Sequence, residues 1–284
     1  MIVTDFLVVG SGIAGMSTAL QLSRLGSVVL ITKKSLVSGS TPYAQGGIAG
    51  VRPERSGDDS PQRHYEDTLK AGSNHNDPAA VELLTQQADA ALEFLERHGV
   101  EFDHSLHLEG GHRRPRVWHV ADHTGIAIAR GLRQAVKAAE NIEVIEQAFV
   151  SDLLVRDGEV HGAEYWQGEA GARVFAKWTV LASGGLGQVY EWTTNPPEAT
   201  GDGIILALRA GAARRDLEFV QFHPTALATK ASPLPLLTEA LRGAGARIVT
   251  TDRIAAADAL ATRDEVSRQL VPAQRSGPVF LDLP

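Results

Sequence analysis

The chain opens on an apolar run that passes into a helical pattern. Residues 6–9 are continuously apolar, residues 16–25 repeat apolar side chains at helical spacing, and residues 27–32 form a second apolar run. Between the first run and the helix stands the segment Gly10-Ser11-Gly12-Ile13-Ala14-Gly15. The order strand, glycine-rich turn, helix, strand predicts a βαβ unit in a parallel sheet.

Further along, the pattern alternates between helical and strand-like segments. We expect helices over 64–71, 78–98, 124–140 and 204–212, with Val81, Leu84, Ala88, Leu92 and Leu95 on the buried face of the second. We expect strands within 142–182, with turns at 157–158 and 168–171, and a strand over 217–222. A polar helical run surrounds Arg263.

These elements predict an α/β fold: a Rossmann-like dinucleotide-binding domain with an antiparallel β insert. The composition changes character near residue 228, so we place the domains at 1–228 and 229–284, the second being incomplete. The segment 33–51 is rich in Ser, Gly and Thr and predicts a long ordered loop across the ligand face.

Bulk composition narrows the function classes. The net charge of -7 argues against a nucleic-acid binder, which needs clustered cations. The chain has no cysteine, which excludes disulfides and thiol catalysis, and its ten histidines show no ligand spacing, so we expect no metal. No apolar run is long enough to span a bilayer and no targeting segment is evident, so we expect a cytoplasmic protein without a membrane partner.

The glycine-rich turn points to a dinucleotide. One glycine allows the sharp turn out of the strand, which needs a residue without a Cβ. One lets the backbone approach a pyrophosphate, and one lets the helix pack closely against the sheet. Dinucleotide sites for NAD place an acidic residue about twenty positions further on, but this chain has Lys33-Lys34 there. Because a cation favours a 2′-phosphate, NADP is a fair competitor as the dinucleotide on this local chemistry alone.

Seven further blocks follow one another along the chain, and their order carries a family resemblance. They are Ser40-Thr41-Pro42-Tyr43-Ala44-Gln45-Gly46-Gly47, Glu109-Gly110-Gly111-His112, Thr194-Asn195-Pro196, Gly201-Asp202-Gly203, Gln221-Phe222-His223-Pro224-Thr225, Leu237-Thr238-Glu239-Ala240-Leu241-Arg242-Gly243 and Arg263-Asp264. The chain resembles the succinate dehydrogenase, fumarate reductase and L-aspartate oxidase flavoprotein family. Within it, the chain is most similar to the L-aspartate oxidase branch.

The resemblance implies that the Rossmann-like domain is an FAD-binding domain and that the start of an α+β capping domain follows it. It gives FAD as the cofactor and assigns residues to it. They are Gly10, Ser11, Gly12, Ile13, Ala14, Gly15, Lys33, Ser40, Thr41, Pro42, Tyr43, Ala44, Gln45, Gly46, Gly47, Phe149, Val150 and Asp202. For Phe149 and Val150 a backbone contact and an ordinary buried strand are both open. Covalent-flavin relatives have a histidine where this chain has Ser40, and a serine cannot form that link. We therefore expect non-covalent FAD.

The reaction that the resemblance implies is the oxidation of L-aspartate to iminoaspartate, with oxygen or fumarate as acceptor, at the start of NAD biosynthesis. By the same resemblance, Arg263 is the acid/base residue, His223 and Thr238 contact a substrate carboxylate, Glu109 meets the substrate ammonium, and Glu239 orients the arginine. Arginine suits the clamping of a diacid because its planar fork binds carboxylates bidentately. Whether the product passes to quinolinate synthase is left open.

Several of these residues could instead have a purely structural role. Arg263 could form a solvated ion pair, and His223 could be a turn histidine. The basic cluster of His112, Arg113, Arg114 and Arg116 either attracts a dianion or forms a surface loop, and we favour the loop for all but His112.

Family members extend further, so we expect an N-terminal portion or a degraded copy that folds incompletely or only with help. The alternatives are a soluble fumarate reductase-like enzyme, against which Glu109 speaks, and an inactive flavin-binding remnant.

Overall fold

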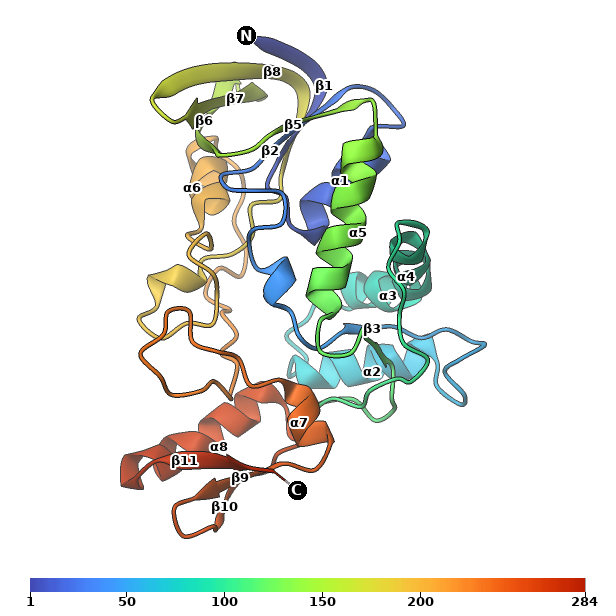
Figure 1. Ribbon diagram of the computed structural model, residues 1–284, viewed down its shortest axis with the longest axis vertical. Coiled ribbons are helices and arrows are strands. Elements are labelled where there is room, and N and C mark those ends of the chain that lie inside the picture. The colour runs from blue at the N-terminus through green and yellow to red at the C-terminus, as the bar shows by residue number, and fades with distance from the viewer. Residues whose placement is uncertain (284) are drawn as a thin grey trace.

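A six-stranded sheet organises the larger part of the molecule. The computed structural model describes residues 1–283 (Figure 1). The strands lie in the order β5-β2-β1-β8-β7-β6. Their bounds are β1 (Ile2–Val9), β2 (Val28–Ile31), β5 (Ile142–Ile145), β6 (Ala148–Arg156), β7 (Glu159–Gln167) and β8 (Ala170–Leu181). The first four strands in that order are parallel, and β7 and β6 continue the sheet antiparallel. The predicted fold class, with its antiparallel insert, is confirmed.

Helices cover both faces of this sheet. Helices α1 (Ile13–Leu22) and α5 (Thr124–Ala138) lie side by side on one face, and α6 (Asp202–Arg209) lies on the other (Figure 1). Because successive strand residues point to opposite faces, Val8 packs with the first pair of helices and Leu7 packs with Leu206 of α6. Helices therefore shield both faces of the sheet from water, which explains why consecutive strand residues are apolar.

Two tight turns join the antiparallel strands where the sequence predicts turns. Arg156 pairs with Glu159 across the turn at Asp157 and Gly158. Both turn residues have positive φ, 54° and 81°, the geometry that matches the twist of a two-residue hairpin. The second turn contains Gly168, with φ of 61°.

The helical layer between the sheet and the C-terminal part differs from the prediction in one respect. Helix α2 (Pro61–Ala71) is followed by α3 (Pro78–Gln86) and α4 (Ala88–Arg97), so the single helix expected over 78–98 is wrong. Gln87 leaves the helical conformation, with φ of -91° and ψ of 2°. This break turns Leu84 outward, where it is 58% exposed. The two-stranded pair β3 (Ile48–Ala49) and β4 (Val117–Trp118) lies beside this layer, and the short helices η1 (Thr41–Tyr43) and η2 (Gly187–Val189) lie in loops.

The C-terminal part has a sheet and a core of its own. Strands β9 (Arg247–Thr250), β10 (Ala255–Ala257) and β11 (Val279–Asp282) form it in the order β10-β9-β11. Helix α8 (Arg263–Ser276) packs on it through Val266 and Leu270, and the short helix α7 (Glu239–Gly243) precedes it. The domain boundary at residue 228 stays a prediction.

The strand expected over 217–222 is wrong, since this segment has no regular structure. Its aromatic residues face outward: Phe219 is 65% exposed and Phe222 is 55% exposed. An apolar run of this length predicts a strand only where a neighbouring strand supplies the hydrogen bonds. Within residues 1–283, none of the helices has both the length and the apolar character required to cross a bilayer.

Candidate functional site

The turn after β1 requires glycine at two positions for reasons internal to the fold. Gly10 has φ of +110°, and a Cβ there would lie 2.3 Å from the carbonyl oxygen of Ala182. A Cβ on Gly15 would lie 1.8 Å from the carbonyl oxygen of Gly10. Helix α1 can therefore approach the end of the sheet only without these side chains.

Gly12 differs, because the protein itself does not exclude a side chain there. Its backbone is extended, with φ of -67° and ψ of -177°, and a Cβ would meet only the Thr41 hydroxyl, at 3.4 Å. Gly12 instead lines a cavity of about 280 Å³ at the N-terminus of α1 and the carboxyl ends of β1 and β2. Open space beside a glycine at a helix N-terminus suits a phosphate group.

Most of the residues that the sequence assigns to the cofactor line this cavity. They are Gly10, Ser11, Gly12, Ile13, Ala14, Lys33, Ser40, Thr41, Phe149, Val150 and Asp202. Gly15 and residues 42–47 do not line it. The lining residues that are absent from that assignment include Ser183, Gly184, Gly185 and Glu198. The glycines after β8 were the available signal, because they permit a close approach of backbone to a ligand.

The lysine that favoured NADP has a partner in the protein. Lys33 Nζ donates to Asp202 Oδ2 at 2.6 Å and to Thr200 Oγ1 at 2.7 Å. Burial raises the pKa of Asp202, but the hydrogen bonds from Lys33 and Thr200 outweigh it and hold that pKa below its ordinary value. The two charges compensate each other, so Lys33 offers no free cation for a 2′-phosphate.

We expect Gly12→Val to abolish FAD binding while leaving the fold intact. The valine branches would occupy the cavity at the N-terminus of α1, and the extended backbone at Gly12 accepts a β-branched residue. A loss of at least about 100-fold in FAD affinity, roughly 3 kcal/mol, is expected by fluorescence titration. Unfolding of the apo chain should be unchanged. Gly15→Ala is the contrasting variant, since its clash with Gly10 should destabilise the apo chain as well.

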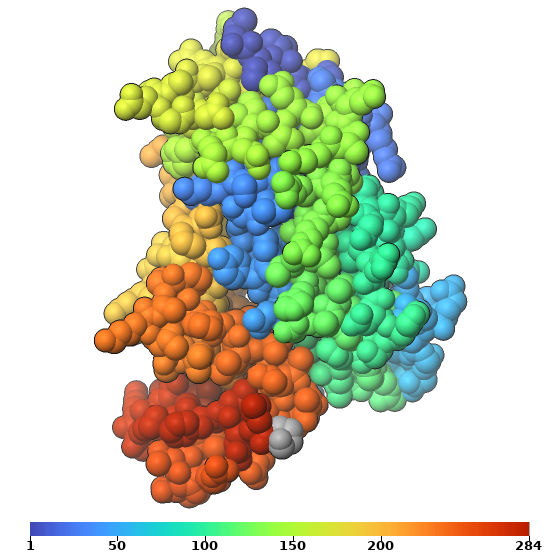
Figure 2. Space-filling model, in the orientation of Figure 1, coloured from blue at the N-terminus to red at the C-terminus, as the bar shows by residue number. Residues whose placement is uncertain are grey.

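The loop over 40–47 runs from this cavity to a second, larger cleft. At its start, the Thr41 hydroxyl accepts a hydrogen bond from the Ile13 N–H at 3.0 Å. Along its length, Thr124 at the start of α5 donates to the Gly46 carbonyl at 2.6 Å. At its end, a Cβ on Gly46 would lie 2.9 Å from Glu109 Oε1. In Figure 2 the blue surface of this part of the chain lies between the green surface of α5 and the yellow to orange surface.

The second cleft, of about 830 Å³, brings acidic and basic side chains together from distant parts of the sequence. Three predicted site residues line it: Glu109, Glu239 and Arg263. His112 and Gln221 line it as well. A cleft with opposed charges of this kind can bind a zwitterion or a diacid.

Arg263 is held in place by its neighbours. It is the first residue of α8, and the Glu265 carboxylate fixes that start by accepting from the Thr262 N–H at 3.2 Å. Its Nε donates to Glu239 Oε2 at 2.8 Å, and its Nη1 donates to Gln221 Oε1 at 2.9 Å. The Arg263 side chain keeps 35% exposure to the cleft, whereas Glu239 is 5% exposed.

Two of these neighbours were missed by the sequence assignment. Gln221 and Arg242 both stand inside quoted blocks, but neither was singled out. Arg242 is fully buried, and its Nη2 lies 2.9 Å from Glu239 Oε1. Glu239 therefore faces two arginines, Arg242 and Arg263. Burial lowers the pKa of Arg242, and the Glu239 carboxylate opposes that effect.

Glu109 lies in the same cleft without a hydrogen-bond partner for its buried Oε1. Burial raises the pKa of Glu109, and the nearby Glu239 carboxylate raises it further. Arg263 and Arg242 act in the opposite direction without cancelling the shift. A buried carboxyl group with an unused oxygen is a ready acceptor for a ligand N–H.

The remaining two predicted substrate contacts do not line this cleft. His223 Nδ1 lies 3.0 Å from the Thr225 carbonyl, and burial followed by the charge of Arg263 lowers the pKa of His223 to about 4. Thr238 caps α7, its hydroxyl accepting from the Ala240 N–H at 3.3 Å. His223 thus lies close enough to Arg263 for the charge of the arginine to lower its pKa. Thr238 caps the start of a helix.

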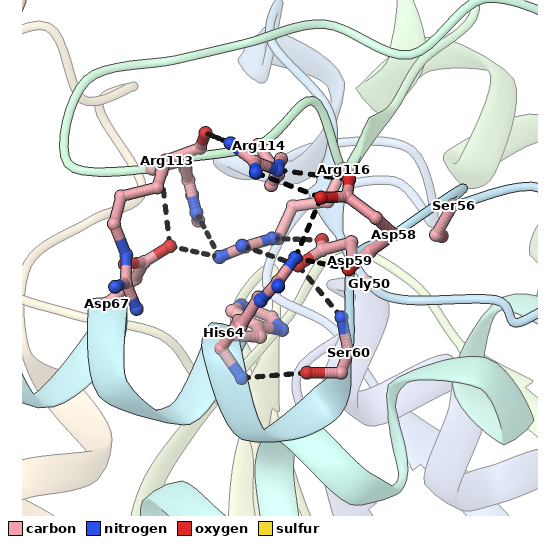
Figure 3. A network of polar contacts seen from close by, with 12 residues as sticks. Gly50, Ser56, Asp58, Asp59, Ser60, His64, Asp67, Arg113, Arg114 and Arg116 are labelled. Atoms are coloured by element: carbon pink, nitrogen blue, oxygen red, sulfur yellow. Dashed lines mark hydrogen bonds and ion pairs between the residues drawn. The ribbon is translucent and has the colours of Figure 1, made fainter.

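The basic cluster after Glu109 is paired with acids, as Figure 3 shows. Arg116 is fully buried between Asp59 and Asp67. The complete network joins four arginines, Arg63, Arg113, Arg114 and Arg116, to four carboxylates, Asp58, Asp59, Glu66 and Asp67. It therefore presents no excess of positive charge to a dianion. Arg116 also does not belong to a surface loop, because its side chain is buried together with its acidic partners.

His64 lies beneath this network, and it predicts a dependence of stability on pH. Burial, the charge of Arg116 and His112 lower the pKa of His64 to about 4, while Asp59 and Asp67 oppose the shift. The unfolded chain therefore binds a proton between pH 6.5 and 4 that the folded chain does not. Folding is stabilised by this effect above pH 6.5 and loses it as pH falls towards 4. We expect His64→Gln to reduce that loss by roughly 3 kcal/mol in urea unfolding. The exposed His104→Gln should leave it unchanged.

No cluster of three or more metal-ligating side chains occurs within residues 1–283. The loop over 40–47 thus joins the glycine turn and the first cavity to the charged cleft. A family model described as an FAD binding domain matches residues 5–282. The chain belongs to this FAD-binding family.

Curated relatives in the family are L-aspartate oxidases. The L-aspartate oxidase of Nostoc sp. is 45% identical over 280 residues, covering 94% of this chain and 48% of the relative. That of Synechocystis sp. is 42% identical over 304 residues, covering 98% of this chain and 54% of the relative. The chain thus spans about half the length of the curated relatives it matches.

Two solved structures have a similar fold. A quinol fumarate reductase chain of E. coli (FrdA) matches with a TM-score of 0.92 and 28% identity, over 100% of this chain and 54% of that one. The Mycobacterium smegmatis Sdh1 complex matches with a TM-score of 0.84 and 32% identity, over 99% of this chain and 52% of that one. Both matches extend over nearly the whole chain, so the described residues have the FAD-binding fold throughout.

Proposed function

We propose that this chain carries the FAD site and part of the substrate site of an L-aspartate oxidase. The observation that carries the proposal is the meeting of Glu109, Glu239 and Arg263 in one cleft, at the end of the loop that starts in the FAD cavity. The names of the curated relatives support the same activity.

The residues of the first cavity fit FAD held without a covalent bond. The open space beside Gly12 at the N-terminus of α1 would accept the pyrophosphate, and the paired Lys33 and Asp202 present polar atoms to ribose hydroxyls. Ser40 lines this cavity and offers no imidazole for a histidyl link. When bound, FAD supplies the two-electron acceptor for the hydride from the substrate Cα.

The side chains of the second cleft divide the work on the substrate. The family resemblance assigns acid/base chemistry to Arg263. In our proposal Arg263 would instead bind one carboxylate of L-aspartate through its exposed edge, while Glu239 and Gln221 keep its plane fixed. The unused Glu109 Oε1 would accept a hydrogen bond from the substrate ammonium. Because its pKa is raised, Glu109 is a stronger base than an exposed glutamate and can accept the ammonium proton. Loss of that proton and of the hydride converts L-aspartate to iminoaspartate.

Glu109 also separates this function from that of a fumarate reductase. A carboxyl group gains an ammonium partner from aspartate, but it would face only carboxylates and carbon in fumarate or succinate. Oxygen or fumarate as final acceptor, a cytoplasmic location and the passage of iminoaspartate to quinolinate synthase stay predictions of the family resemblance.

The test is flavin reduction by the whole chain loaded with FAD. Under anaerobic conditions L-aspartate should bleach the visible flavin band, and oxygen should restore it with release of hydrogen peroxide. Bleaching by succinate alone would favour the fumarate reductase alternative. A yellow protein that no dicarboxylate bleaches would favour the remnant instead, and would overturn the proposal.

A further inference from the structure

We propose that His112 is an uncharged hydrogen-bond donor to a substrate carboxylate, held in its Nε2–H tautomer by the buried guanidinium of Arg116. The inference rests on the proposed function for the identity of the ligand, a diacid. The tautomer follows from the protein alone.

The tautomer is decided by a contact on the far edge of the ring. His112 Nδ1 lies 3.1 Å from Arg116 Nη1. A guanidinium group carries only N–H donors, so the ring nitrogen that faces it must present a lone pair. The single proton of the neutral imidazole therefore sits on Nε2.

Arg116 cannot turn away from this contact. Its Nε and Nη2 donate to the two oxygens of Asp59 at 2.7 and 2.9 Å, and its Nη1 also donates to Asp67 Oδ2 at 2.7 Å. Arg116 and Asp59 are both fully buried, and Asp67 is 3% exposed. The bidentate pair with Asp59 fixes the guanidinium plane, as Figure 3 shows.

His112 also lines the cleft that holds Glu109 and Arg263. Burial and the charge of Arg116 lower the pKa of His112, against the opposing charges of Asp67, Glu239 and Asp59. His64, whose ring centroid lies 5.7 Å away, is itself neutral near pH 7 because its pKa is about 4. His112 therefore donates without carrying charge, and its strength as a donor does not change between pH 7 and pH 8.

A neutral donor complements Arg263 in the same cleft. A diacid needs two anchored carboxylates, and a second cation would also attract phosphate and other anions. An N–H whose position is fixed to a buried network adds geometry without adding charge. His112 is thus a binding residue, and Arg116 is a positioning residue that acts through it.

The tautomer is tested by ¹⁵N NMR of the full chain labelled at histidine, assigned with His112→Gln. At pH 7, His112 should show a protonated Nε2 and an unprotonated Nδ1. His98 serves as an internal contrast, because its Nδ1 lies 2.6 Å from the Phe94 carbonyl and must carry the proton. An imidazolium or an Nδ1–H signal for His112 would overturn the inference, whether or not L-aspartate reduces the flavin.

The binding role is tested with malonate as a non-oxidisable diacid on the FAD-loaded chain. His112→Gln keeps an amide oxygen for Arg116 and an amide N–H for the cleft, whereas His112→Leu keeps neither. We expect malonate affinity to fall at least tenfold in the leucine variant and less than threefold in the glutamine variant, with FAD affinity unchanged in both. Equal affinities in the two variants would refute the donor role. If malonate binds as expected but L-aspartate fails to bleach the flavin, only the proposed reaction is wrong.

Discussion

Replacing Arg263 with leucine is expected to slow the reduction of bound FAD by L-aspartate at least about 100-fold. The variant removes the charged fork that faces the cleft and leaves Glu239 with Arg242 as its remaining partner. FAD affinity should stay within twofold of the parent, because Arg263 does not line the FAD cavity. Stopped-flow absorbance under anaerobic conditions measures the rate, and FAD titration measures the affinity.

Arg268 supplies the matched control for this variant. It lines the same cleft on the same helix, but it is 70% exposed and pairs with Asp264 at 2.6 Å. Arg268→Leu removes an equal charge and should change the reduction rate less than threefold. If the two leucine variants slow the reaction equally, the role proposed for Arg263 reduces to general electrostatic attraction.

Replacing Arg116 with leucine is expected to destabilise the folded chain by about 3 to 5 kcal/mol. The change removes the charged partner of Asp59, which is fully buried, and leaves Asp67 with Arg113 as its partner. Desolvated carboxylates without a counter-charge are costly, and this cost exceeds the packing that leucine restores. The free energy of unfolding, measured in guanidinium chloride, reports the loss.

The control lies two residues away in the same network. Arg114 pairs with Asp58 at 2.9 Å, but the two side chains are 43% and 67% exposed. Arg114→Leu should therefore change the free energy of unfolding far less than Arg116→Leu does. A similar loss in both variants would mean that the cluster acts as one cooperative surface network, and that burial of Arg116 carries no special weight.

Local pattern predicts the parts of this fold whose interactions are local. The glycine turn after β1, the hairpin at Asp157 and Gly158 and the presence of a helix at Arg263 depend on backbone conformation and short-range interactions, so neighbouring residues suffice. The prediction failed where distant partners decide. The segment 217–222 is apolar enough for a strand but meets no strand to pair with, and the helix break at Gln87 has no proline or glycine to announce it.

The site shows the same division. Gly12, Lys33 and Glu109 could be selected from motifs because each motif imposes its own chemistry. Asp202 and Glu239 were selected as well, but that Lys33 pairs with Asp202, 169 residues away, was not foreseen, and Gln221, 42 residues from its partner Arg263, was not selected at all. Such pairs follow from how the chain is packed, and their spacing along the sequence carries no period to recognise.

By itself, the sequence determined that this chain builds a glycine-lined dinucleotide cavity at the end of a parallel sheet. The family resemblance of its blocks also singled out Glu109, Glu239 and Arg263, which the structure brings to one cleft. Only the tertiary structure decided that the basic residues after Glu109 are neutralised by Asp58, Asp59, Glu66 and Asp67. The free energy of a charge depends on burial and on its neighbours in space, and neither can be read along the chain.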